Sequence, residues 1–130
     1  MQNFLIAHYN DVLIYGKETP DCDIEIKFIE IPPLAELTPL HILQFRDFRA
    51  GYIRLADFER RRYGDYIYCR IYGCLFRIDI PNRSYEVVET DFNGICFMQN
   101  YILIMKDSPT EQLFKLTPPG MEIAETVELA

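Results

Sequence analysis

The 130-residue chain has no tryptophan and only six glycines, two serines and two histidines. The glycines stand singly, so the sequence has no glycine-rich loop that could cradle a phosphate, and we expect no nucleotide cofactor. Neither serine lies in a Gly-x-Ser-x-Gly elbow, and we expect His8 and His41 to have only local packing or solvent contacts. The sequence therefore predicts a protein that is not an enzyme, with no catalytic residue and no cofactor.

Cysteine and long apolar runs are also scarce. The four cysteines are too few for the disulfide scaffold of a small secreted domain, and they do not form the two close pairs of a zinc site. Because free cysteine is often buried, Cys69 and Cys74 are predicted to be core residues. The first residues have an apolar run of only four, at 4–7, which predicts neither a signal peptide nor a spanning helix. We expect a cytoplasmic protein without a bound metal or a membrane partner.

Positive charge is scarce outside the middle of the chain. The formal net charge is −7, with two lysines against seven acidic residues in 1–45 and two against eight in 84–130. Residues 46–83 hold all nine arginines against five acidic residues. An acidic total argues against general affinity for nucleic acid, which depends on many uncompensated basic groups. We expect the basic centre to pair with the acidic ends in the folded chain.

Short aromatic and β-branched runs, separated by turn residues, predict a mainly β fold in one domain of residues 1–130. The pattern is typical of an antiparallel meander, a sandwich or a half-propeller-like sheet. Asn10-Asp11, Pro81-Asn82 and Asn93-Gly94 are among the predicted turns. The predicted strands are 4–8, 12–15, 24–31, 66–72, 74–80, 85–89, 95–98, 101–106, 112–116 and 121–128.

Residues 38–62 differ from the rest and predict one or two helices. Thr38 followed by Pro39 suits a helix start, and apolar residues recur at helical spacing after them. The arginines at 60–62, followed by Gly64, are typical of a helix C-terminus. A hairpin within the same segment is the alternative.

The stretch at 59–73, ERRRYGDYIYCRIYG, contains four arginines and four tyrosines. A tight turn at Tyr72-Gly73 would pair residue 71 with residue 74 and residue 69 with residue 76. One face of this hairpin would then be apolar and buried. The other face would carry Tyr66, Tyr68 and Arg70 in solvent, as residue types that favour protein interfaces.

A weak internal repeat relates residues 65–89 to residues 100–128. Tyr66 aligns with Tyr101, and the Leu-Phe-Arg-Ile of 75–78 aligns with the Leu-Phe-Lys-Leu of 113–116. Residues 3–30 form a more distant third copy. Such a unit resembles a β-propeller blade in architecture, although three units are fewer than the about four blades of the smallest closed propellers.

A compact acidic chain with aromatic strands and no active site fits a protein-binding inhibitor. In character it resembles a bacterial immunity protein that neutralises a basic, nuclease-like toxin by blocking its site, because carboxylates would meet the basic groups that otherwise hold phosphates. The predicted partner-binding residues are Asp21, Asp23, Glu25, Tyr66, Tyr68, Arg70, Glu86, Glu89, Asp91, Glu122 and Glu125.

Two alternatives use the same features differently. A propeller-like scaffold could associate into homo-oligomers through its unpaired terminal strands, since exposed strand edges invite pairing. An RNA-binding module could stack bases on the tyrosines and arginines of the hairpin. The overall negative charge makes nucleic acid the less favoured partner.

Overall fold

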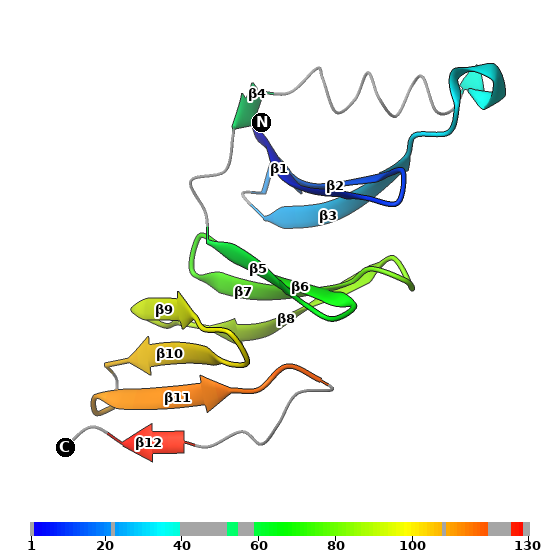
Figure 1. Cartoon of the computed structure of the whole chain (residues 1–130). Coiled ribbons are helices and arrows are strands. Elements are labelled where there is room, and N and C mark those ends of the chain that lie inside the picture. The colour runs from blue at the N-terminus through cyan, green and yellow to red at the C-terminus, as the bar shows by residue number, and fades with distance from the viewer. Residues whose placement is uncertain are drawn as a thin grey trace. The chain divides into compact units, whose positions relative to one another are not determined.

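The computed structural model describes residues 2–21, 23–39, 52–54, 59–107, 109–119 and 126–128 (Figure 1). The chain divides into two compact units, Met1–Asp57 and Phe58–Ala130, which we describe separately. The predicted mainly β fold is confirmed, because the described residues form three four-stranded sheets. That residues 1–130 form one domain stays a prediction.

The first unit contains one sheet with the strand order β3-β2-β1-β4. Strands β1 to β3 are antiparallel neighbours, whereas β4 pairs parallel to β1. The predicted turn at Asn10-Asp11 joins β1 to β2, and its φ angles of 46° and 61° suit the primed turns that match the twist of a hairpin. The bounds are β1 Gln2–Tyr9, β2 Val12–Glu18, β3 Ile24–Glu30 and β4 Tyr52–Arg54, with a 3-10 helix η1 at Leu34–Glu36.

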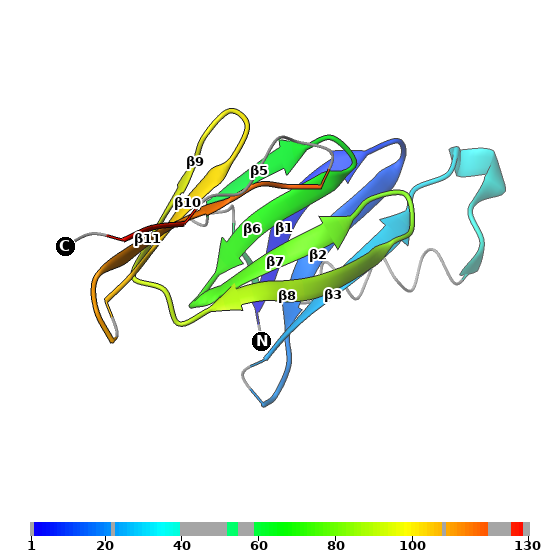
Figure 2. The same cartoon turned by 90° about the horizontal axis from the view of Figure 1, so that it is seen from below.

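The second unit contains two sheets that follow each other along the chain. Each is an antiparallel meander, with the orders β5-β6-β7-β8 and β9-β10-β11-β12, and Figure 2 shows β6, β7 and β8 side by side. The second sheet consists of β5 Arg60–Tyr63, β6 Tyr66–Ile71, β7 Cys74–Asp79 and β8 Ser84–Thr90. The third consists of β9 Gly94–Phe97, β10 Ile102–Lys106, β11 Gln112–Leu116 and β12 Thr126–Glu128.

The predicted repeat corresponds to these two meanders. Residues 65–89 form β6, β7 and β8, and residues 100–128 contain β10, β11 and β12 in the same order. The aligned Leu-Phe segments lie in β7 and β11, the third strands of their sheets. The sequence similarity therefore marks equivalent strands of two successive four-stranded sheets.

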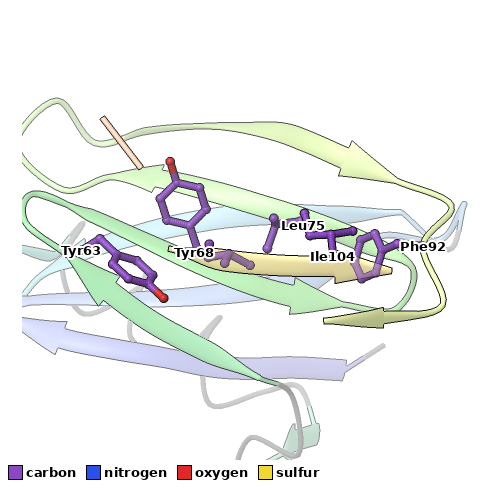
Figure 3. Packing of buried hydrophobic residues seen from close by; sticks show 6 residues of the cluster. Tyr63, Tyr68, Leu75, Phe92 and Ile104 are labelled. Carbon is purple, nitrogen blue, oxygen red and sulfur yellow. The ribbon is translucent and has the colours of Figure 1, made fainter. Parts of the chain in front are cut away.

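A buried cluster joins the second and third sheets. Figure 3 shows it from close by, with side chains from both sheets and from the connection between them. The buried members are Tyr63, Tyr68, Leu75, Phe92, Ile102 and Ile104. The Tyr63 hydroxyl donates a hydrogen bond to the Met98 carbonyl oxygen at 2.6 Å, and the Tyr101 carbonyl oxygen lies 3.2 Å away. Edge strand β5 is thereby tied to the β9–β10 hairpin.

The predicted register of the β6–β7 hairpin is confirmed, but the predicted exposure of its second face is wrong. Ile71 pairs with Cys74, and Cys69 with Phe76, across a two-residue turn in which Tyr72 has a φ of 55°. Tyr68, predicted to face solvent, is 1% exposed. The reason is that the third sheet covers that face, so the central strands are buried on both sides.

The prediction of a helix end at 60–62 is also wrong. Residues 60–63 form β5, which pairs antiparallel with β6, and residues 52–54 form β4. Gly64 has a φ of +59° in the turn between β5 and β6. A helix C-terminus and a tight hairpin turn both need this left-handed conformation, which is why the glycine was compatible with either. Residues 40–51 and 55–58, where the rest of the predicted helix falls, lie outside the described residues.

We predict that Gly64→Ala lowers the free energy of unfolding by about 1–2 kcal/mol, because a left-handed φ strains any residue with a Cβ atom. No heavy atom lies within 4 Å of the position that this Cβ would take, so the loss comes from the backbone alone. Gly73→Ala is the matched control, since Gly73 also has open space around it but no left-handed φ. Urea unfolding measures both variants, and equal losses would contradict the assignment.

Candidate interaction surfaces

Three predicted acidic residues gather at the β2–β3 hairpin of the first unit: Asp21, Asp23 and Glu25, here called the acidic turn. All three are exposed. Local hydrogen bonds fix the turn, since the Thr19 amide donates to the Asp23 carbonyl oxygen at 2.8 Å and the Ile24 amide donates to Asp23 Oδ1 at 2.9 Å. Glu25 lies 3.2 Å from the Lys27 ammonium, in an exposed ion pair of low strength.

Tyr66 and Glu86, far apart in sequence, come together around Arg77 in the second sheet. The Arg77 guanidinium lies 5.6 Å from the centroid of the Tyr66 ring and forms an ion pair with Glu86. Burial raises the pKa of the neighbouring Tyr68, and the hydrogen bond and charge of Arg77 act in the opposite direction. The cation is thus held between an aromatic ring, a phenol and a carboxylate.

An open pocket of about 260 Å³ lies beside this arginine, at the end of the sheet. Asp79, in its wall, accepts hydrogen bonds from the Asn82 amide at 3.2 Å and from Asn82 Nδ2 at 2.8 Å. Arg77 was not among the predicted site residues. Its place follows from the hairpin register, because Arg77 pairs with Tyr68 on one side and Glu86 on the other.

Arg70, Glu89 and Asp91 lie towards the other end of the same sheet. The Arg70 guanidinium is 5.2 Å from the centroid of the Phe92 ring, and Glu89 accepts a hydrogen bond from the Lys106 ammonium of the third sheet. Asp91 is exposed and has a φ of 56°. Glu89 thus connects the second and third sheets, and Arg70 lies against a ring of the segment between them.

The remaining predicted residues do not join these groups. Tyr68 lies in the buried cluster between the sheets and therefore is not accessible to a partner in the folded chain. Glu122 and Glu125 lie outside the described residues. The acidic turn belongs to the first unit and the other acidic positions to the second, so we treat them as separate surfaces.

The cysteines differ sharply in their surroundings. Cys69 is fully buried, and this burial raises the pKa of its thiol to about 12, while the charge of Arg60 opposes the shift. A thiol with this pKa is protonated near neutral pH and is a poor nucleophile. Cys96 is exposed on β9, and its sulfur lies 3.5 Å from the Met98 sulfur.

In the described part of the chain, no three His, Cys, Asp or Glu side chains are arranged to hold a metal ion. None of the helices among these residues has the length and apolar character needed to cross a membrane. No protein-family model, curated protein or solved structure matches the chain.

We predict that Tyr68→Ala destabilises the fold by about 3 kcal/mol or more, because it leaves a cavity in the cluster between two sheets. Tyr85→Ala is the control, since Tyr85 is 40% exposed on edge strand β8 and its ring centroid lies 6.2 Å from that of Phe76. That variant should lose about 1 kcal/mol or less. Thermal and urea unfolding compare the two, and a mild effect at Tyr68 would place its ring in solvent after all.

We also predict that iodoacetamide near pH 8 modifies Cys96 in the native protein while Cys69 stays unmodified. Mass spectrometry of the digested protein assigns each modified site. In concentrated urea, Cys69 should react as fast as Cys96, because its protection comes from burial. Rapid reaction of native Cys69 would contradict both the burial and the raised pKa.

Proposed function

We propose that the protein is a protein-binding inhibitor that acts by association with a basic partner. Its most concrete form is an immunity-type protein that covers the site of a nuclease-like toxin in the bacterial cytoplasm. The observation that carries this proposal is the acidic turn, where Asp21, Asp23 and Glu25 place three exposed carboxylates within five residues of one hairpin. Hydrogen bonds at Asp23 hold the end of this turn, which lowers the conformational freedom that is lost on binding.

The charge balance of the described residues supports the same choice of partner. The carboxylates of the acidic turn are exposed, whereas Arg70 and Arg77 lie against aromatic rings. A net charge of −7 would attract a basic protein over a distance of about a Debye length and raise its rate of association. Such a partner would present lysines or arginines that otherwise contact phosphate.

Tyr66 and Glu86 add a second possible contact region beside the 260 Å³ pocket. Here the carboxylate of Glu86 is already paired with Arg77, so a basic partner would have to replace an existing ion pair. In the acidic turn, only Glu25 has an ion pair with another described residue, Lys27. We therefore assign the larger share of the attraction to the acidic turn.

A self-assembling, propeller-like scaffold is the second candidate. The observation that favours it is the pair of successive four-stranded meanders, whose equivalent strands carry similar sequences. RNA binding is less supported, because the proposed stacking platform loses Tyr68 to the core and both Arg70 and Arg77 contact rings of the chain itself. Both the inhibitor function and the scaffold function require association with another protein chain.

For the inhibitor function, we predict that the tagged chain retains a basic protein from a lysate of its native cells at low salt and releases it at high salt. Mass spectrometry identifies the retained protein, and titration of its nuclease activity with the chain should reach full inhibition near equimolar ratio. The triple variant Asp21→Asn, Asp23→Asn, Glu25→Gln should slow association about 10-fold or more, because it removes the local steering charge.

The matched control removes three exposed carboxylates from the second unit: Glu59→Gln, Asp65→Asn, Glu111→Gln. It changes the net charge by the same amount, so it should slow association much less if the acidic turn itself makes the contact. If the two triple variants slow association equally, the acidic turn acts only through its share of the net charge. Retention of no basic protein would overturn the inhibitor function.

A further inference from the structure

The open pocket of about 260 Å³ in the second sheet lies where β6, β7 and β8 run side by side (Figure 2). Three half-buried residues of the two inner strands and three exposed residues of edge strand β8 line it. These six are Tyr66, Arg77, Asp79, Ser84, Tyr85 and Glu86. Pockets for drug-sized ligands have about 300–1,000 Å³, so this one suits a smaller group, such as one long side chain.

The strand register explains why the polar groups of the pocket share one face. Asp79 pairs with Tyr66 on β6 and with Ser84 on β8. Arg77, two residues earlier on β7, pairs with Glu86. Residues two apart on a strand point to the same side of a sheet, so both rows contribute to one face. The pocket is therefore built on paired strands, which hold its groups in fixed positions.

The charge of the lining favours a cation as the ligand. Two carboxylates, Asp79 and Glu86, stand against the one guanidinium of Arg77, which leaves one net negative charge. Arg77 forms an ion pair with Glu86. Each oxygen of Asp79 accepts a hydrogen bond from Asn82, and both donors are neutral amides, so the negative charge of Asp79 stays in place. A carboxylate has about four acceptor sites, and Asp79 therefore has sites for further donors.

The surroundings of Arg77 indicate which cation suits this pocket. Its guanidinium lies 5.6 Å from the centroid of the Tyr66 ring and pairs with Glu86, so the chain already holds one guanidinium between a ring and a carboxylate. Asp79 and the 40% exposed Tyr85 supply a second carboxylate and a second ring in the same pocket. A planar guanidinium contacts a ring with its face and a carboxylate with its edge, whereas an ammonium is a compact point charge.

We propose that this pocket binds an arginine side chain of the basic partner, with the guanidinium donating to Asp79 and lying beside Tyr85. The inference rests on the proposed inhibitor function and names the binding site for one residue of its partner. Because Asp79 is the acceptor, the incoming side chain does not have to displace Arg77 from Glu86. The hydroxyl of Ser84, at the rim, is a neutral acceptor for a further N–H group.

The pocket and the acidic turn contribute to different steps of binding. The exposed carboxylates of the acidic turn act at long range and raise the rate of association. A side chain that fills a pocket acts only at contact, so its loss raises the rate of dissociation. Arginine is also among the residue types that most often carry the binding energy of protein interfaces.

Binding of a blocked arginine, N-acetyl-arginine-N-methylamide, to the purified full chain tests the site without the partner. In a titration followed by two-dimensional NMR, the backbone amide signals of Asn82, Ser84 and Glu86 should shift and saturate, with a dissociation constant on the order of 10⁻³ M. The matched probe is the blocked citrulline, which has the same shape and no charge. It should bind about 10-fold more weakly, because a hydrogen bond to a charged donor is stronger.

Asp79→Asn should also weaken the binding of blocked arginine about 10-fold, because it removes the charged acceptor and keeps the shape of the side chain. Glu111→Gln is the control with the same change of net charge. Glu111 precedes Gln112, which pairs with Lys106, and Lys106 contacts Glu89 at the other end of β8. Its dissociation constant for blocked arginine should match that of the wild type.

Ser84→Arg is a second variant, in case Asp79→Asn disturbs the turn that Asn82 closes. Ser84 is exposed at the rim, so the new side chain should occupy the pocket and abolish binding while circular dichroism shows an unchanged fold.

Three results would overturn the arginine pocket: no saturable shifts in the wild type, equal binding of the two probes, or binding that both pocket variants retain. The inhibitor function would stand in each case, because it is carried by the acidic turn. Saturable arginine binding together with retention of no basic protein from the lysate would overturn the inhibitor function and leave the pocket as an arginine site.

Discussion

The structure of the second unit depends on the burial of Tyr68 and Leu75 in one cluster with Ile102 and Ile104. Once the third sheet covers this side of β6 and β7, both central strands of the second sheet are buried on their two faces. The same contact brings edge strand β5 close enough for the Tyr63 hydroxyl to reach the Met98 carbonyl oxygen. Burial also raises the pKa of Tyr63 and Tyr68, so both phenols would ionise only at a higher pH than a solvent-exposed tyrosine.

Local patterns were sufficient to predict most strands and the register of the central hairpin, because a period of two fixes which residues share a face. Local patterns did not predict which side chains are buried between the second and third sheets. Tyr66, Tyr68 and Arg70 alternate along one face of β6 and indicated a polar surface. In the structure, Arg70 lies near the Phe92 ring and Tyr68, which pairs with Arg77, is buried. Only the position of the third sheet decides this, and no local pattern contains it. Strand β5 was missed for a different reason, since its arginines and Gly64 suit a helix end equally well.

The candidate contacts were predictable to different degrees. The acidic turn follows from five consecutive residues and local hydrogen bonds, so the sequence alone locates it. The contact of Tyr66 with Arg77 and Glu86 follows once the pairing of β6, β7 and β8 is known. The pairing of Glu89 with Lys106 joins two sheets, and it depends on the packing of the cluster. Contacts within one turn can therefore be predicted from sequence alone. Contacts within one sheet also require the strand pairing, and contacts between sheets require their packing.

Several arginines in and near the stretch at 59–73 lie against aromatic rings of the same chain. The guanidinium of Arg61 lies 5.8 Å from the Tyr63 ring centroid, and those of Arg70 and Arg77 lie 5.2 and 5.6 Å from rings of Phe92 and Tyr66. Each ring lowers the cost of keeping a cation on a partly buried sheet. Three of the nine arginines thus lie against the chain's own aromatic rings, while the carboxylates of the acidic turn are exposed. Because the net charge of the whole chain is −7, its long-range field would repel a polyanion, which supports the basic partner that we propose.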